Sequence, residues 1–164
     1  MPVPPKRALH PLLLERGYWR NRLEELRLTR LSVLLIPRAE LSTGLVEVDE
    51  FRIRAHDGIR LFGIRALCRF GPVLRPARIR CVGTCDLPDI DTGAVCRGAA
   101  EFVFQQPAGR RLEDRVLDLL RVFQLAVSSE NIDPRNIELV VPDGGPSPDE
   151  FLIASQLVQD EFNR

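Results

Sequence analysis

The chain has 164 residues, of which 45% are hydrophobic and 28% are charged. This size and balance fit one globular domain over residues 1–164, and they exclude a disordered tail and a fibrous repeat. No apolar run approaches the roughly 20 residues that cross a bilayer, and the first residues lack the apolar stretch and cleavage site of a secretory signal. We therefore expect a soluble, cytoplasmic protein that does not bind membranes.

Positive and negative charges balance over the whole chain but not within its halves. Residues 1–80 carry 16 basic and 8 acidic side chains, a net charge of +8, and residues 81–164 carry 7 basic and 15 acidic ones, a net charge of −8. A basic half can bind nucleic acid. Here the arginines stand singly between apolar residues, as Arg52 and Arg54 do, and not in the clusters of a phosphate-binding arm. We expect no nucleic-acid partner.

The four cysteines, Cys68, Cys81, Cys85 and Cys96, allow two interpretations. Cys81 and Cys85 have the spacing of one half of a structural zinc site, but Cys68 and Cys96 do not form the second pair that such a site needs. Cys81 also ends an apolar run that is typical of a buried strand. Reduced thiols in the core are the better interpretation, and we expect neither a metal site nor a cofactor.

The hydrophobic pattern divides the chain into helices and strands. Asp57-Gly58 between two alternating runs is a strong hairpin signal, and Ser147 three residues before Glu150 is typical of a helix start. In chain order, the predicted elements are a proline-rich arm at 1–11, a helix at 12–28, a connection at 29–44, strands at 45–55, 59–67 and 77–82, a short helix at 94–100, a strand at 101–105, a helix at 112–127, a turn at 131–134, a strand at 137–141 and a helix from 147 to about 162. This order predicts an α/β fold with a mostly parallel sheet covered by helices.

Several segments carry a family resemblance when they are taken in order. They are Tyr18-Trp19 before Leu23-Glu24-Glu25-Leu26, the turn from His56 to Gly63, Arg75-Pro76-Ala77, the stretch Asp114 to Arg121, and Ile132 to Ile137. Together they resemble the acetyl xylan esterase and cephalosporin-C deacetylase family of α/β-hydrolases over residues 18–160. The resemblance implies an α/β-hydrolase-like sheet with an N-terminal hairpin, in which strand 137–141 leads to the nucleophile.

The positions that carry the chemistry of that family differ in this chain. Where the family has the turn G-x-S-x-G, this chain has Val141-Pro142-Asp143-Gly144-Gly145, so Asp143 takes the place of the serine. The family's oxyanion position, a His-Gly pair, is occupied by Val82, Gly83 and Thr84. The sequence stops at Arg164, where the family continues to a catalytic acid, a histidine and further strands. We therefore expect a truncated α/β-hydrolase-like domain with no catalytic residues.

Other candidates for chemistry have simpler interpretations. His10 and His56 are the only histidines, and we expect both to be solvated, in the arm and in the hairpin turn. Asp143 lacks a base that would let it act as a nucleophile, and it fits a turn. Ser147 fits the helix cap better than a displaced nucleophile, and Cys85 lacks a base as well.

Three acidic residues, Asp86, Asp89 and Asp91, have a spacing that could hold a divalent cation. They lack the bidentate glutamate and the central glycine of a calcium loop. A solvated acidic loop is the favoured interpretation.

The predicted strand 137–141 lies mid-sheet in the resembled family, whereas here the strands beside it are missing. A flat apolar edge strand is prone to aggregation unless another chain covers it. We therefore predict a non-catalytic binding or structural subunit that forms a homo-oligomer or binds another protein chain. Its partner surface would comprise Ile137, Leu139, Val141, Phe151, Val158 and Phe162. One alternative is a carbohydrate or small-ester deacetylase completed by residues from another chain, and another is a decayed gene product.

Overall fold

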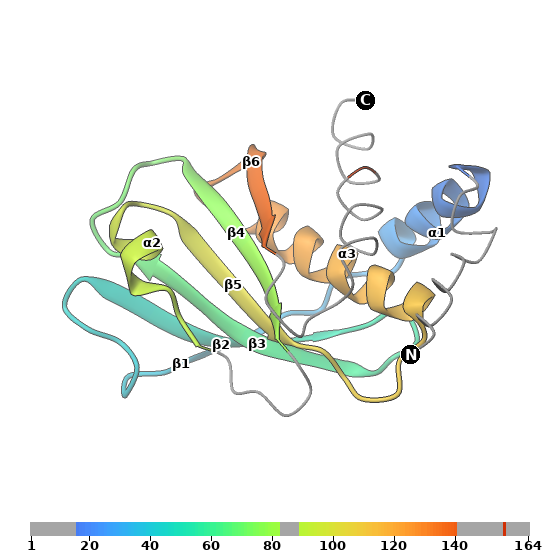
Figure 1. Ribbon diagram of the computed structural model, residues 1–164, viewed down its shortest axis with the longest axis horizontal. Helices are drawn as coiled ribbons and strands as arrows, with labels where there is room; N and C mark the ends of the chain where they lie inside the picture. The colour runs from blue at the N-terminus through green and yellow to red at the C-terminus, as the bar shows by residue number, and fades with distance from the viewer. Residues whose placement is uncertain (1–15, 83–88, 141–155, 157–164) are drawn as a thin grey trace, which may run out of the picture. The chain divides into compact units, whose positions relative to one another are not determined.

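The computed structural model describes residues 16–82, 89–140 and 156 (Figure 1). The chain divides into two compact units, Met1–Arg30 and Leu31–Arg164. The single domain expected over residues 1–164 stays a prediction. Within the described residues, no helix is both long enough and apolar enough to span a membrane.

The first unit contains helix α1, Arg16–Leu28. This confirms the predicted helix, apart from positions 12–15, which lie with the proline-rich arm outside the described residues. Thr29 follows the helix, and its amide and hydroxyl both donate to the carbonyl of Glu25, at 3.1 and 2.9 Å. These bonds satisfy one of the carbonyls that a helix leaves unpaired at its C-terminal end.

The second unit is built on a mixed sheet. Its elements are β1 (Leu34–Pro37), β2 (Val46–Arg54), β3 (Arg60–Cys68), β4 (Arg75–Val82), α2 (Thr92–Cys96), β5 (Ala100–Gln105), α3 (Leu112–Ser128) and β6 (Ile132–Val140). The described strands form a six-stranded sheet in the order β1-β2-β3-β5-β4-β6. Helix α2 lies over one face of the sheet and α3 over the other (Figure 1). This arrangement confirms the expected α/β fold class, but the sheet is mixed and not mostly parallel, because three of its five strand pairs are antiparallel.

The direction of the strands brings four of their ends together. β4 pairs in parallel with β5 and with β6, whereas the β1–β2, β2–β3 and β3–β5 pairs are antiparallel. Strands β2, β4, β5 and β6 therefore run in one direction, and β1 and β3 run in the other. The carboxyl ends of those four strands meet at one side of the sheet, which we call the carboxyl end of the sheet.

The expected connection at 29–44 is wrong in one stretch, because residues 34–37 form β1. This strand pairs with β2, with Leu34 opposite Arg52 and Pro37 opposite Asp49. Four apolar residues are too few to show the alternation by which a strand is recognised in a sequence. Pro37 is tolerated because it ends a strand at the edge of the sheet.

Strands β2 and β3 form the predicted hairpin. The register runs from Val46 opposite Cys68 to Arg54 opposite Arg60. The turn contains Gly58 with φ of +85°, a conformation that glycine adopts without strain. The sequence signal Asp57-Gly58 therefore marks the turn correctly.

The short helix expected at 94–100 begins and ends earlier, at Thr92 and Cys96. Asp91 determines its start, because the carboxylate accepts a hydrogen bond from the amide of Ala94 at 3.1 Å. The helix is followed by Gly98, whose φ of +102° reverses the chain before β5 begins. The predicted strand at 101–105 is confirmed as β5.

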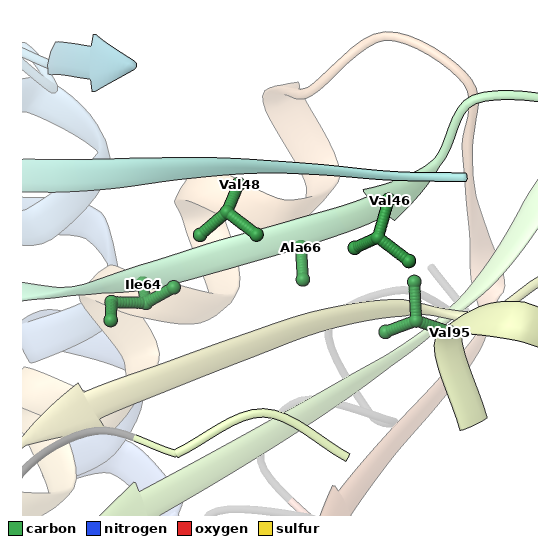
Figure 2. Packing of buried hydrophobic residues seen from close by; sticks show 5 residues of the cluster. All are labelled: Val46, Val48, Ile64, Ala66 and Val95. Atoms are coloured by element: carbon green, nitrogen blue, oxygen red, sulfur yellow. The ribbon is translucent and has the colours of Figure 1, made fainter. Parts of the chain in front are cut away.

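A small hydrophobic cluster fills the space between α2 and the hairpin. It consists of Val46, Val48, Ile64, Ala66 and Val95. Figure 2 shows the four strand residues pointing to the same side of the hairpin, where Val95 of α2 meets them. The alternation of side chains along β2 and β3 therefore supplies one core on this face and leaves the other residues of each strand for the face covered by α3.

The larger core lies on the α3 face. Helix α3 forms at its predicted position and contacts β2, β4, β5 and β6. Its buried hydrophobic residues are Val116, Leu117, Leu119, Leu120, Val122, Phe123, Leu125 and Ala126. In the sheet, the ring centroids of Phe51 and Phe102 are 6.3 Å apart, a favourable distance for aromatic packing.

Strand β6 contains the predicted strand as far as Val140 but begins earlier, at Ile132. The turn expected at 131–134 is therefore wrong beyond Asn131, whose φ is 66°. Between the pairs Arg75–Ile132 and Ala77–Ile137, two steps along β4 face five along β6. The extra residues form a bulge, which lets the strand include a proline. The predicted helix from 147 lies outside the described residues.

The cysteines differ in their surroundings. Cys81 is fully buried, as predicted for a core thiol, and Cys68 is half-buried against the cluster around Val95. Cys96 is exposed, which contradicts the prediction. The reason is that α2 is short and buries only Ala94 and Val95. Cys85 lies outside the described residues.

The close approach of β3 to β5 at Gly63 yields a test of the fold. A Cβ at this position would overlap the carbonyl oxygen of Val103 and lie 2.8 Å from Cα of Phe104. We expect Gly63→Ala to lower the free energy of unfolding by about 1–3 kcal/mol, measured by urea denaturation. Gly44→Ala is the control, because a Cβ there meets nothing within 4 Å. Equal denaturation midpoints for the two variants would contradict this packing.

Candidate functional site

The carboxyl end of the sheet is the place where open α/β sheets bind ligands. Strand β2 ends there and leads into the hairpin turn, and β5 ends there and leads through a short loop into α3. The ends of β4 and β6, at Val82 and Val140, lie on the same side of the sheet. The hairpin turn, the loop after β5 and the first turn of α3 therefore form one candidate region.

Few of the predicted site residues fall within the described part of the chain. Val82 ends β4 and is 8% exposed. Ile137 and Leu139 of the predicted partner surface lie on β6 and are half-buried. Several candidates lie outside the described residues: His10, Gly83, Thr84, Cys85, Asp86, Val141, Asp143, Ser147, Phe151, Val158 and Phe162.

A buried carboxylate, Asp118 of α3, organises the polar side chains at the carboxyl end. It is 0% exposed and accepts two hydrogen bonds from Arg110, from Nε at 2.9 Å and from Nη2 at 2.6 Å. Such bidentate pairs combine charge with fixed geometry. The Nη1 and Nη2 groups of Arg110 also contact the carboxylate of Asp57 in the hairpin turn. One guanidinium therefore joins α3 to the β2–β3 turn.

Gln106, just after β5, extends this network to β4. Its side-chain nitrogen donates to Asp118 at 3.1 Å, and its amide donates to the carbonyl of Val82 at 3.0 Å. The Sγ of Cys81 donates to the side-chain oxygen of Gln106 at 3.7 Å. Contacts thus run from the hairpin turn through α3 to the end of β4, and they hold these elements in one arrangement.

The network shifts the pKa values of its two acidic groups in opposite directions. Burial raises the pKa of Asp118, and the bonds from Arg110 oppose that shift. The hydrogen bond from Arg110 lowers the pKa of Asp57, which is closer to solvent. The hydrogen bond to Asp118 in turn raises the pKa of Arg110, so this arginine stays charged.

His56 is not the solvated turn residue expected from the sequence. Its side chain is 25% exposed, and Nε2 lies 3.3 Å from Oδ1 of Asp114 in the first turn of α3. Its Nδ1 is buried and has no hydrogen-bond partner among the described residues. The cause is the contact between Arg110 and Asp57, which holds the hairpin turn against the start of the helix. His56, Asp57 and Asp114 thereby place three possible metal-ligand atoms within 4.8 Å of one another.

The described strands separate His56 from the end of β6, which the predicted nucleophile position follows in the chain. β5 and β4 lie between β3 and β6. Three strand spacings amount to roughly 14 Å. A general base has to lie within hydrogen-bond reach of the group that it deprotonates. The sheet order therefore gives no support to His56 as a base for a nucleophile after β6.

The acidic residues Asp89 and Asp91 before α2 are exposed, as expected for a solvated loop, and they also contact the rest of the protein. Asp91 caps α2 and accepts a hydrogen bond from Nη1 of Arg78 at 2.9 Å. Asp89 accepts from the amide of Ile90 at 2.9 Å, and its carbonyl accepts from Arg80. These contacts attach the loop to β4.

A second buried carboxylate, Glu101 of β5, supports the same loop. It is 1% exposed and accepts hydrogen bonds from Nε of Arg80 at 3.2 Å and from the amide of Asp91 at 2.9 Å. Burial raises its pKa. Arg78 lies 3.4 Å from Glu138, so charged contacts continue from the loop to β6. The contacts of Asp91 and Glu101 thus hold the segment before α2 against β4 and β5.

Sequence reasoning missed Asp118, Arg110 and Gln106 as site residues. For Asp118 a signal existed, because its helical neighbours Leu117 and Leu119 are apolar and a charge on such a helix needs a buried partner. No pattern identified Arg110 or Gln106, because their partners are distant in the chain.

Loss of the guanidinium of Arg110 should destabilise the protein, because Asp118 would stay buried without its cation. We expect Arg110→Leu to lower the free energy of unfolding by about 3–5 kcal/mol. Arg110→Leu combined with Asp118→Asn should regain part of this loss. Arg111→Leu is the control, because that side chain is 78% exposed. Chemical denaturation measures all four proteins, and equal losses in the single and double variants would contradict the role of the buried charge.

Comparison with known proteins identifies the fold. No protein-family model and no curated protein matches the chain. Among solved structures, an acetyl xylan esterase from Thermoanaerobacterium sp. JW/SL YS485 is similar with a TM-score of 0.70 and 16% identity, covering 87% of this chain and 54% of that one. An acetyl xylan esterase from Paenibacillus sp. R4 is similar with a TM-score of 0.65 and 14% identity, covering 86% of this chain and 56% of that one. A glucuronoyl esterase from Solibacter usitatus is similar with a TM-score of 0.52 and 9% identity, covering 77% of this chain and 53% of that one.

These similarities confirm, at the level of the fold, the resemblance found in the sequence. The chain spans about half the length of the structures that it matches. It therefore has the α/β-hydrolase-like fold of the acetyl xylan esterases over about half the length of those enzymes.

Proposed function

We propose that this protein is a non-catalytic binding or structural subunit, and that a protein partner docks on the edge strand β6. The position of β6 carries this proposal. It is last in the sheet order, and no strand of the described residues pairs with its outer side. An edge strand offers unpaired N–H and C=O groups to a further chain unless something covers them.

The part of β6 that suits pairing is short. Its first residues form the bulge that contains Pro134, and both bulges and prolines discourage edge pairing. From Ile137 to Val140 the strand pairs regularly with β4, and half-buried Ile137 and Leu139 alternate with exposed Glu138. We therefore centre the partner surface on residues 137–140. We propose that this surface extends to Val141, Phe151, Val158 and Phe162.

Two further observations support a subunit without catalysis. Asp143 occupies the position of the serine in the resembled family, and His56 lies three strands from the end of β6. Among the described residues, Cys68 and Cys96 are free thiols, which fits a reducing compartment, and we propose a cytoplasmic location.

Self-association through β6 predicts a mass larger than that of one chain. Light scattering should give at least twice the chain mass of 18.6 kDa. We expect Val140→Lys to reduce this value to a single chain mass, because a lysine on an edge strand opposes pairing. Val73→Lys should not, since Val73 is 82% exposed and lies outside the strands. Circular dichroism checks that both variants fold. A single chain mass for the unmodified protein would rule out a second copy as the partner.

The alternative function is an ester hydrolase that another chain completes, and the fold of the matched esterases favours it as the second candidate. We expect no hydrolysis of p-nitrophenyl acetate above the buffer rate by the purified protein between pH 6 and 9. Activity that disappears in Asp143→Ala or Ser147→Ala, and persists in the control Asp160→Ala, would replace our proposal with this alternative.

A further inference from the structure

We propose that His56, Asp57 and Asp114 form a binding site for a divalent transition-metal ion, for which zinc is the best fit. The site lies where the hairpin turn meets the first turn of α3. It is separated from β6 by the intervening strands. The proposal is therefore independent of the partner surface described above.

The geometry of the ligand atoms fits one shared ion. The three side chains place their ligand atoms within 4.8 Å of one another, and Nε2 of His56 lies 3.3 Å from Oδ1 of Asp114. Two ligands bound about 2.1 Å from a zinc ion, at angles of about 90–109°, lie about 3.0–3.4 Å apart. The 3.3 Å between Nε2 of His56 and Oδ1 of Asp114 lies within this range.

Both carboxylates keep an oxygen on which an ion can bind. Arg111 donates to Oδ2 of Asp114, which leaves Oδ1 facing His56. In Asp57, Arg110 contacts Oδ2 closely, whereas the contacts of Oδ1 are long, at 3.3 and 3.4 Å. A carboxylate oxygen has two lone pairs, so Oδ1 can accept a further ligand. The two arginines orient these carboxylates as outer-shell partners of a metal site do.

Charge favours a cation at this place. The network contains three carboxylates, of Asp57, Asp114 and Asp118, and two guanidinium groups, of Arg110 and Arg111. The formal charge of these five groups is therefore −1.

The imidazole of His56 is suited to ligation. Its Nε2 faces Oδ1 of Asp114 and is the nitrogen that would bind the ion. The neutral ring is the form that binds metal ions. The three side chains are 12–35% exposed, so an ion can enter from solvent.

The donor set determines the class of ion. One imidazole nitrogen with two carboxylate oxygens suits zinc, whereas magnesium and calcium prefer oxygen ligands alone. Three protein ligands leave a fourth position for water.

Zinc titration of the purified full chain against a chromophoric chelator tests the proposal. We expect one zinc ion per chain, and at least tenfold weaker binding in His56→Gln and in Asp114→Asn. The control is His10→Gln, which changes the only other histidine and should bind as the unmodified protein does. A large excess of magnesium should not displace the zinc. As a second measurement, zinc should raise the thermal midpoint of the unmodified protein and of His10→Gln, but not that of His56→Gln.

Two results would overturn the site. One is the lack of saturable zinc binding by the unmodified protein. The other is that His56→Gln and Asp114→Asn bind zinc as tightly as the unmodified protein does, as expected if a thiol such as that of Cys96 held the metal. Circular dichroism verifies that the variants fold, and if His56→Gln fails to fold, Asp114→Asn decides the question.

Discussion

The fully buried carboxylate of Asp118 is the constraint on which the carboxyl end of this sheet depends. A charge without a partner in the core would destabilise the fold by several kcal/mol, so Arg110 has to lie beside it. Because the same guanidinium also reaches Asp57, the hairpin turn is held at the start of α3. Gln106 adds the end of β5 to the same carboxylate. The positions of the hairpin turn, the end of β5 and the start of α3 thus all depend on the buried carboxylate of Asp118.

The sequence predicted most of the fold, because the elements with a clear local pattern formed where that pattern lay. Asp57-Gly58 marked the hairpin, and the broad apolar face of 112–127 marked α3. Strand β1 was missed because four residues carry no periodicity, and Pro134 indicated a turn where a bulge keeps the chain in β6. The polar network was missed because Arg110 and Asp57 are 53 residues apart, and only the tertiary structure brings such residues together.

Strand β6 and the β2–β3 hairpin, which β5 and β4 separate in the sheet, have different chemistry. At the β6 side, a regular stretch at 137–140 follows a bulge, and charged contacts from Arg78 to Glu138 attach it to β4. At the hairpin side, His56 and two carboxylates gather around the first turn of α3. The fold therefore holds two separate surfaces, the outer side of β6 and the side-chain donors around the first turn of α3. Neither surface requires the nucleophile turn of the resembled family.

The place of β4 in the sheet also has a consequence for synthesis on the ribosome. β4 lies between β5 and β6, yet it precedes both in the chain. The hairpin can close as soon as its two neighbouring segments emerge, whereas β4 stays unpaired until the later strands have been translated. During that interval the nascent chain exposes Ala77, Ile79 and Cys81, which are all buried in the finished protein. Contacts between distant segments form slowly, so β4 is the segment that a chaperone would have to protect.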